Sequence, residues 1–120
     1  MRLLIVDDNA RVRRMIAEMT GPLATDVIEC SDGSQALHAY LLHRPDVVLM
    51  DISMDGLDGV AAAVEIITAD PHARVVMVTD YDGVELREAA QAAGVRGYVL
   101  KENLFELRGL LEHLGPADRP

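Results

Sequence analysis

Three short runs of the chain are continuously apolar, and they restrict the possible folds more than any other feature of the sequence. Residues 3–6 read Leu-Leu-Ile-Val, residues 47–50 read Val-Val-Leu-Met, and residues 75–78 read Val-Val-Met-Val. Strands that are buried on both faces have this composition, and they occur in parallel sheets covered by helices. We therefore expect the three runs to form the centre of a parallel β-sheet.

Two weaker runs complete the predicted sheet. Residues 27–28 are flanked by Asp26 and Glu29, which is typical of an edge strand, and residues 98–100 form the last run. Between the runs, apolar residues recur at helical spacing, and these stripes predict helices whose buried faces include Met15, Leu41 and Val64. The stripes lie within residues 12–19, 36–41, 60–67, 86–93 and 104–114.

Five strand–helix pairs with short connections predict an α/β fold. We expect a doubly wound, flavodoxin-like (βα)5 domain with a five-stranded parallel sheet in the order 2-1-3-4-5. The predicted domain covers residues 1–114, and residues 115–120 have no periodicity, which is typical of a tail or the start of a linker.

The charge and cysteine content exclude several classes of protein. Twenty acids against 11 Lys and Arg give a net charge of −9, which would repel a phosphate backbone, so we expect no direct nucleic-acid binding. A single cysteine, Cys30, excludes an internal disulfide framework and a Cys-rich zinc site. The sequence has neither a signal peptide nor an apolar run long enough for a membrane span, so we expect a soluble cytoplasmic protein.

Polar side chains follow the predicted strands where each strand ends. Asp7 and Asp8 follow residues 3–6, Asp51 follows residues 47–50, and Thr79 and Lys101 end the last two runs. Carboxyl ends of parallel strands lie along one edge of the sheet, and ligands bind there at the point where the strand order reverses. We expect these five side chains to converge on one pocket.

Three clustered carboxylates indicate a cation site. Two unit charges 4 Å apart cost about 4 kcal/mol at an effective dielectric constant of 20, so the cluster needs a counter-ion or a raised pKa. Oxygen ligands without His or Cys favour Mg²⁺. Lys101 and Thr79 suit a phosphoryl group, and a carboxylate can be the nucleophile that accepts one. Asp51 stands alone, which favours it as acceptor, whereas Asp7 and Asp8 are adjacent and suit a metal.

Together these motifs resemble the receiver domain of two-component response regulators over about residues 2–114. The segments that carry the resemblance are Ile-Val-Asp7-Asp8, Val-Val-Leu-Met-Asp51-Ile-Ser-Met, Met-Val-Thr79 and Gly-Tyr98-Val-Leu-Lys101. The resemblance implies that a histidine kinase phosphorylates Asp51. It also implies a Mg²⁺ ion held by Asp8, Asp51 and the backbone carbonyl of Ser53, with Asp7 acting through water. Thr79 and Tyr98 would form a switch pair, and Lys101 would bind the phosphoryl oxygens.

Two departures from the family pattern affect the expected function. Asp80 stands directly after Thr79, where a small residue is usual, so its carboxylate should hinder a phosphodonor, and the next residue, Tyr81, is expected to modulate access. Glu102 follows Lys101 where the family often has proline, which is similar to the NarL/FixJ subgroup. Members of that subgroup usually carry a DNA-binding domain, and none is present in this chain.

The resemblance predicts a signalling switch rather than a turnover enzyme. A homodimer through the helices of residues 86–93 and 104–114 with the strand of residues 98–100, or through residues 12–19 and 104–114, is an expected interaction. Asp80 and the missing proline favour an alternative, in which the domain is a phosphorylation-independent interaction module. Three basic residues, Arg11, Arg13 and Arg14, belong to the first predicted helix, and we expect them on its solvated face.

Overall fold

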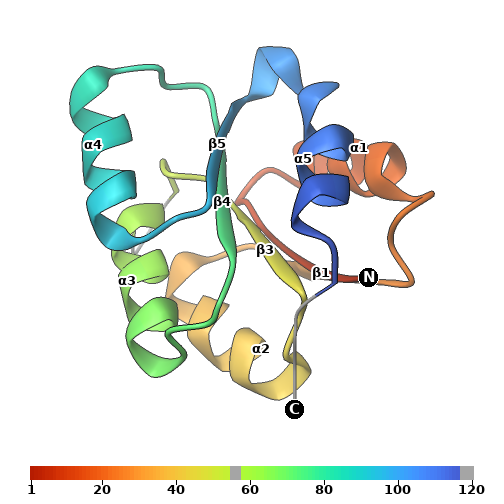
Figure 1. Ribbon diagram of the computed structural model, residues 1–120, viewed down its shortest axis with the longest axis horizontal. Helices are drawn as coiled ribbons and strands as arrows, with labels where there is room; N and C mark the ends of the chain where they lie inside the picture. The colour runs from red at the N-terminus through yellow and green to blue at the C-terminus, as the bar shows by residue number, and fades with distance from the viewer. Residues whose placement is uncertain (55–57, 117–120) are drawn as a thin grey trace.

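The computed structural model describes residues 1–54 and 58–116 and shows a five-stranded parallel sheet between two layers of helices (Figure 1). The strand order is β2-β1-β3-β4-β5, which confirms the predicted flavodoxin-like topology. The strands are β1 (Arg2–Val6), β2 (Asp26–Cys30), β3 (Val47–Met50), β4 (Val75–Thr79) and β5 (Gly97–Leu100). β2 lies at one edge, as its flanking acids predicted.

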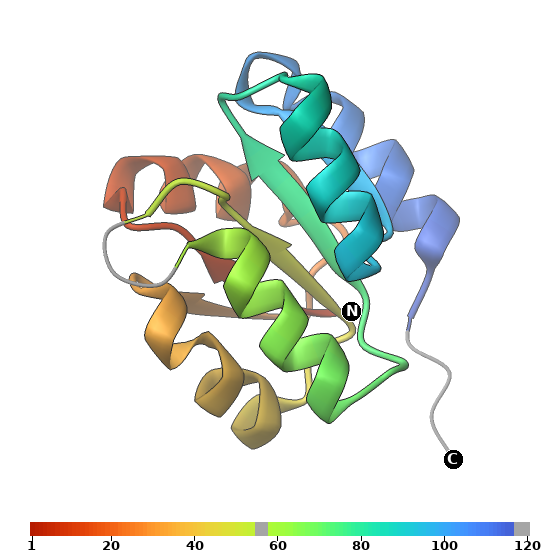
Figure 2. The ribbon, with the colours of Figure 1, turned by 90° about the vertical axis from the view of Figure 1, so that its left-hand side faces the viewer.

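The helices cover both faces of this sheet. α2, α3 and α4 lie on one face, and α1 and α5 on the other (Figures 1 and 2). The helices are α1 (Ala10–Thr20), α2 (Ala36–His43), α3 (Gly59–Ala69), α4 (Val84–Ala93) and α5 (Glu106–Leu114). Two single turns of 3₁₀-helix, Gly33–Gln35 and Lys101–Asn103, precede α2 and α5. In the described part of the chain, no helix is long and apolar enough to span a membrane.

The three continuously apolar runs are fully buried, as predicted. Every residue of β3 and β4 is buried, because alternate side chains point into the two helical layers. Leu4 and Val48 pack with α2, α3 and α4, whereas Leu3 and Leu49 pack with α1 and α5. Such strands fix the register of their carboxyl ends, and therefore of the polar residues that follow them.

Three large apolar residues of the predicted helix faces lie at the surface. Met15 is 48% exposed, Leu41 43% and Val64 44%, so the prediction of their burial was wrong. A short helix buries only a narrow stripe against the sheet. In α1 the buried position is Ile16, one residue after Met15, and in α3 it is Ala63, one residue before Val64.

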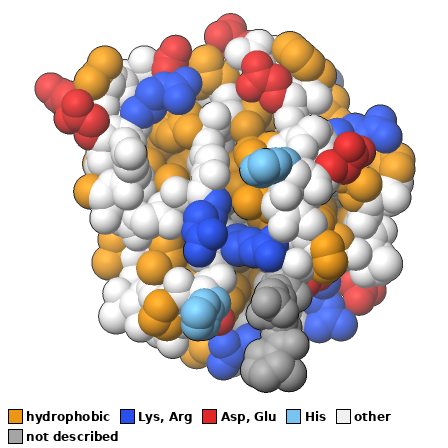
Figure 3. Space-filling view, viewed as in Figure 1, with side chains coloured by type: hydrophobic (Ala, Val, Ile, Leu, Met, Phe, Trp, Pro, Cys, Tyr) orange, Lys and Arg blue, Asp and Glu red, His pale blue; other side chains and the backbone are white. Residues whose placement is uncertain are grey.

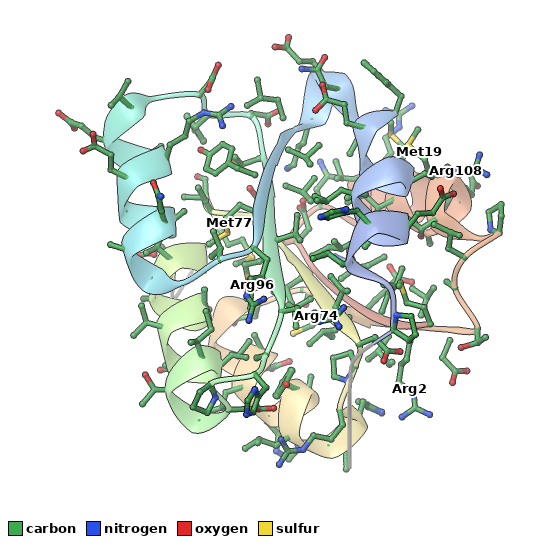
Figure 4. The ribbon with its side chains drawn as sticks, viewed as in Figure 1. Arg2, Met19, Arg74, Met77, Arg96 and Arg108 are labelled. Carbon is green, nitrogen blue, oxygen red and sulfur yellow. The ribbon has the colours of Figure 1, made fainter. Side chains whose placement is uncertain are left out.

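Arginine side chains gather at the amino-terminal edge of the sheet. On the face seen in Figure 3, basic side chains lie near the centre, in the area where Figure 4 labels Arg74 and Arg96. The Arg74 guanidinium donates to the carbonyl oxygens of Leu114, Gly115 and Pro116, at 2.7, 2.6 and 2.9 Å, and so satisfies the last carbonyl of α5 and the two that follow it. The net negative charge of the chain is therefore distributed unevenly, with these bases opposite the polar edge described below.

Candidate functional site

The carboxyl ends of β1 and β3 bring three aspartates together. Asp7 and Asp51 are buried and Asp8 is exposed, and one carboxylate oxygen from each lies within 4.8 Å of the others. β1 and β3 are neighbours in the sheet, β2 lies on the other side of β1, and the connection from β2 to β3 crosses over β1, so this is the predicted reversal of strand order.

Lys101 joins the cluster from the end of β5. Its Nζ lies 3.0 Å from Asp7 Oδ2 and donates a hydrogen bond to Asp51 Oδ2 at 3.2 Å. The Lys101 side chain is only 14% exposed, so the ammonium interacts with the carboxylates in a poorly hydrated environment. The expected meeting of these residues, fifty positions apart in the chain, is present in the structure.

Backbone hydrogen bonds hold the two acidic loops in register. The Asp51 amide donates to the Val6 carbonyl at 2.9 Å, and the Asp7 amide donates to the Cys30 carbonyl at 3.0 Å. The Asp7 and Asp51 side chains accept from the amides of Asn9 and Ser53, at 2.9 and 3.3 Å. Each carboxylate is thus oriented by the loop that begins with it.

The pKa values of Asp51 and Lys101 are both raised, but by different causes. Burial raises the pKa of Asp51, the Lys101 ammonium lowers it, and the Asp7 carboxylate raises it further, with a net rise above the usual value. Burial alone would lower the pKa of Lys101, but the Asp7 and Asp51 carboxylates outweigh this effect and raise it. Lys101 is therefore a permanent cation at neutral pH.

The residues present fit a hard divalent cation. Asp7 Oδ2 is buried and lies 3.0 Å from the Lys101 ammonium, which also contacts Asp51 Oδ2 at 3.2 Å. One ammonium shared by these carboxylates leaves the cluster with a net negative charge, which a divalent cation would offset. Carboxylates within 4.8 Å of one another supply the oxygen ligands that Mg²⁺ prefers.

The remaining predicted site residues lie around this cluster. Thr79 is buried at the end of β4, and its hydroxyl oxygen accepts from the Tyr81 amide at 3.4 Å. Ser53, Asp80 and Tyr81 are exposed, so Asp80 is open to solvent on the loop that follows Thr79. The predicted departures at Asp80 and Tyr81 therefore lie at the surface of the site.

Tyr98 is half-buried and held by the loop between β4 and α4. Its hydroxyl donates to the Tyr81 carbonyl, and the Arg87 guanidinium lies over its ring, 4.4 Å from the centroid. Arg87 also pairs with Asp82 of the same loop at 2.5 Å. Burial raises the pKa of Tyr98 against the opposing effect of Arg87, so the hydroxyl stays a neutral donor. The position of Tyr98 is thereby linked to the loop that follows Thr79.

Two residues that shape the site escaped the sequence analysis. Gly59 approaches the Asp51 backbone so closely that a Cβ there would lie 1.9 Å from the Asp51 carbonyl oxygen. Arg13, expected on the solvated face of α1, instead donates to the Asp7 carbonyl at 2.7 Å. The sequence Asp58-Gly59 was the one pattern that could have indicated a close approach at Gly59. No pattern indicated the contact of Arg13 with Asp7.

This fold and pocket define a class of protein, a flavodoxin-like domain with an acidic cation pocket and a lysine at the carboxyl edge of its sheet. The pattern of the response regulator receiver domain matches residues 3–114. The chain belongs to that family.

Individual relatives agree with this assignment. The chain is 37% identical over 101 residues to the chemotaxis protein CheY of Bacillus subtilis, an alignment that covers 83% of this chain and 84% of that one. It is 37% identical to the transcriptional regulatory protein PdtaR of Mycobacterium tuberculosis, over 83% of this chain but 49% of that protein. A LuxR-family two-component response regulator from Aurantimonas has a similar structure, with a TM-score of 0.87, 29% identity and coverage of 94% and 83% of the two chains.

Proposed function

We propose that this receiver domain accepts a phosphoryl group on Asp51 from the phosphohistidine of a histidine kinase, with Mg²⁺ as cofactor. The observation that carries the proposal is the Lys101 ammonium, 3.2 Å from Asp51 Oδ2 and 3.0 Å from Asp7 Oδ2. A largely buried base that links two acids of an oxygen-ligand cluster offers a fixed positive charge to the oxygens of an incoming phosphoryl group.

The transfer needs few groups from the protein. The Asp51 carboxylate attacks phosphorus, the phosphorus–nitrogen bond of the phosphohistidine breaks, and the imidazole leaves with the electron pair and takes up a proton. Asp8, Asp51 and the Ser53 carbonyl would hold the ion, with Asp7 acting through water. When bound, Mg²⁺ neutralises charge on the phosphoryl oxygens and on the acid cluster. Lys101 would stabilise the same oxygens. In this proposal Asp51 is the acceptor, and the domain acts as a switch rather than as a turnover enzyme.

Phosphorylation would act as a population shift. New anionic oxygens beside Lys101 and Thr79 would draw the Thr79 hydroxyl toward them, and Tyr98 would follow through the loop that holds its hydroxyl. Changing a ratio of 1:99 to 99:1 requires about 5.5 kcal/mol of differential interaction, which a few charge-assisted hydrogen bonds of about 1.5–3 kcal/mol each supply.

The output of the switch is proposed to be a protein surface. α4, β5 and α5, or α1 and α5, would form a homodimer, as in a NarL/FixJ-like regulator with a DNA-binding output outside this chain. The LuxR-family match and the match to the transcriptional regulatory protein PdtaR support a role in transcription regulation, and the coverage of 49% of PdtaR supports a receiver within a longer protein. We propose that this regulator is cytoplasmic. The chain aligns with 84% of the B. subtilis chemotaxis protein, so a receiver without an attached output is the other arrangement to be tested.

Labelling with a small phosphodonor tests the proposal. Acetyl phosphate with Mg²⁺ should add one phosphoryl group to the wild type, detected by intact mass spectrometry and lost in mild acid or base, and EDTA should prevent it. Asp51→Asn should abolish the label, whereas Asp26→Asn, which removes an exposed acid from the opposite end of β2, should not. Stoichiometric label on the Asp51→Asn variant would place the acceptor elsewhere.

Exposed Asp80 at the site supports a second candidate, a phosphorylation-independent interaction module. A wild type that takes up neither acetyl phosphate nor beryllofluoride, while Asp80→Ala does, would favour this candidate over the first.

A further inference from the structure

Arg13 is the residue of α1 that reaches back to the acidic loop. Its side chain is only 16% exposed, and two nitrogens of its guanidinium group make separate contacts. Nη1 donates to the Asp7 carbonyl at 2.7 Å, and Nε donates to Glu29 Oε1 on β2 at 3.0 Å. Its neighbour Arg14 is exposed, so the two adjacent arginines have different surroundings.

The contact falls on the peptide group that joins the two N-terminal acids of the site. The Asp7 amide is fixed by the Cys30 carbonyl, and the Asp7 carboxylate accepts from the Asn9 amide at 2.9 Å. With Arg13 on the carbonyl, all three polar groups of Asp7 that point away from Lys101 have partners. The orientation of the Asp7–Asp8 peptide determines the direction in which the Asp8 side chain leaves the backbone.

Glu29 orients the guanidinium for this contact. Glu29 precedes Cys30, whose carbonyl already holds the Asp7 amide, so β2 contacts Asp7 once directly and once through Arg13. A guanidinium can donate to two acceptors in fixed directions, whereas an ammonium is a point charge on a flexible stem. The geometry therefore depends on arginine rather than on positive charge alone.

We propose that Arg13 is a positioning residue for the cation site, one that orients the Asp7–Asp8 peptide so that Asp8 meets the ion together with Asp51. The inference rests on the proposed Mg²⁺ site. Groups that orient metal ligands from outside the ligand shell alter metal affinity by about 10- to 100-fold when they are removed.

Calorimetric titration with Mg²⁺ of the wild type and two matched variants tests this role. Arg13→Met and Arg14→Met remove the same charge from adjacent positions of α1, so their long-range electrostatic effects on the ion are similar. We expect Arg13→Met to weaken Mg²⁺ binding about tenfold and Arg14→Met to change it less than about twofold. Arg13→Lys, which keeps the charge without the fork, should remain weakened. Equal affinities of the two Met variants, or full recovery in Arg13→Lys, would overturn the proposal.

A second measurement on the metal-free protein separates this proposal from the proposed function. Backbone ¹⁵N relaxation should show that the Asp8 and Asn9 amides lose order in Arg13→Met and keep it in Arg14→Met. If the Asp8 and Asn9 amides of Arg13→Met kept their order, the positioning role would be overturned whatever the Mg²⁺ affinities of the variants. If the wild type bound no Mg²⁺ while the amides still lost order, the cation site would be wrong and the orientation of the loop by Arg13 would stand.

Discussion

The Lys101 ammonium donates to Asp51 across 3.2 Å, in a pocket where the lysine side chain is 14% and the aspartate 5% exposed. Without this base, Asp7 and Asp51 would remain as two buried carboxylates close to each other. The contact therefore links the stability of the fold to the chemistry of the site.

Replacing Lys101 by methionine should destabilise the protein in a pH-dependent way. Burial already raises the pKa of Asp51 above its unfolded value, and loss of Lys101 would raise it further. Between the unfolded and folded pKa values the folded state binds more protons, so stability falls as pH rises through that window. We expect a loss of about 3 kcal/mol at pH 7 and a smaller loss below pH ~4, measured by urea unfolding. A loss that is the same at both pH values would contradict this account.

Gly59 permits the close approach of α3 to the acceptor loop. A Cβ at this position would lie 1.9 Å from the Asp51 carbonyl oxygen and 2.7 Å from its carbon, and backbone atoms cannot give way as a flexible side chain can. We expect Gly59→Ala to shift the Asp51 loop, to lower the free energy of unfolding by about 1–3 kcal/mol and to slow acetyl-phosphate labelling.

Gly109 provides the matched control for that substitution. It lies within α5 with open space where a Cβ would stand, so Gly109→Ala should stabilise the protein by about 0.5–1 kcal/mol and leave labelling unchanged. Labelling of Gly59→Ala at the wild-type rate would show that the close approach does not position Asp51.

The network of Tyr40 and Asp70 should contribute stability that depends on acid pH. The Tyr40 hydroxyl donates to Asp70 Oδ2 at 2.6 Å and lowers the pKa of Asp70, with smaller contributions from the His72 amide and Arg44. A lowered folded pKa stabilises the fold above the unfolded value of about 3.9, and this stability is lost as pH falls through the folded value.

Tyr40→Phe should therefore lower the free energy of unfolding by about 1–2 kcal/mol at pH 7. As pH falls, the free energy of unfolding should decrease less in the variant than in the wild type, measured by chemical unfolding across pH 2–7. Tyr81→Phe removes a hydroxyl from a residue that is 51% exposed and should leave the dependence of stability on pH unchanged. If the free energies of unfolding of wild type and Tyr40→Phe decreased in parallel as pH falls, this network would not contribute to the acid dependence of stability.

The sequence predicted the fold because each central strand is apolar along its whole length. It predicted the site because polar residues directly follow those strands in the sequence. Val47–Met50 followed by Asp51 is a local pattern that needs no knowledge of the rest of the chain. The roles of Arg13 and Gly59 depend instead on contacts between elements. Arg13 reaches a carbonyl in β1's loop and a carboxylate on β2, and Gly59 meets the backbone of Asp51. Those distances follow from helix docking, which periodicity does not specify.

Asp80 should slow phosphorylation by small anionic donors. It is exposed directly after buried Thr79, on the loop that also holds the Tyr98 hydroxyl, so its carboxylate adds negative charge where acetyl phosphate must approach an acidic pocket. We expect Asp80→Ala to be labelled several-fold faster than wild type at low salt, and the difference to shrink as salt screens the charge. Asp80→Asn keeps the size and removes the charge, so it separates repulsion from obstruction: a rate near that of Asp80→Ala indicates charge, and a rate near wild type indicates size. Glu88→Gln, which removes an exposed acid from α4, controls for a general change in net charge. Equal labelling rates for wild type and Asp80→Ala at every salt concentration would show that this carboxylate does not restrict the donor.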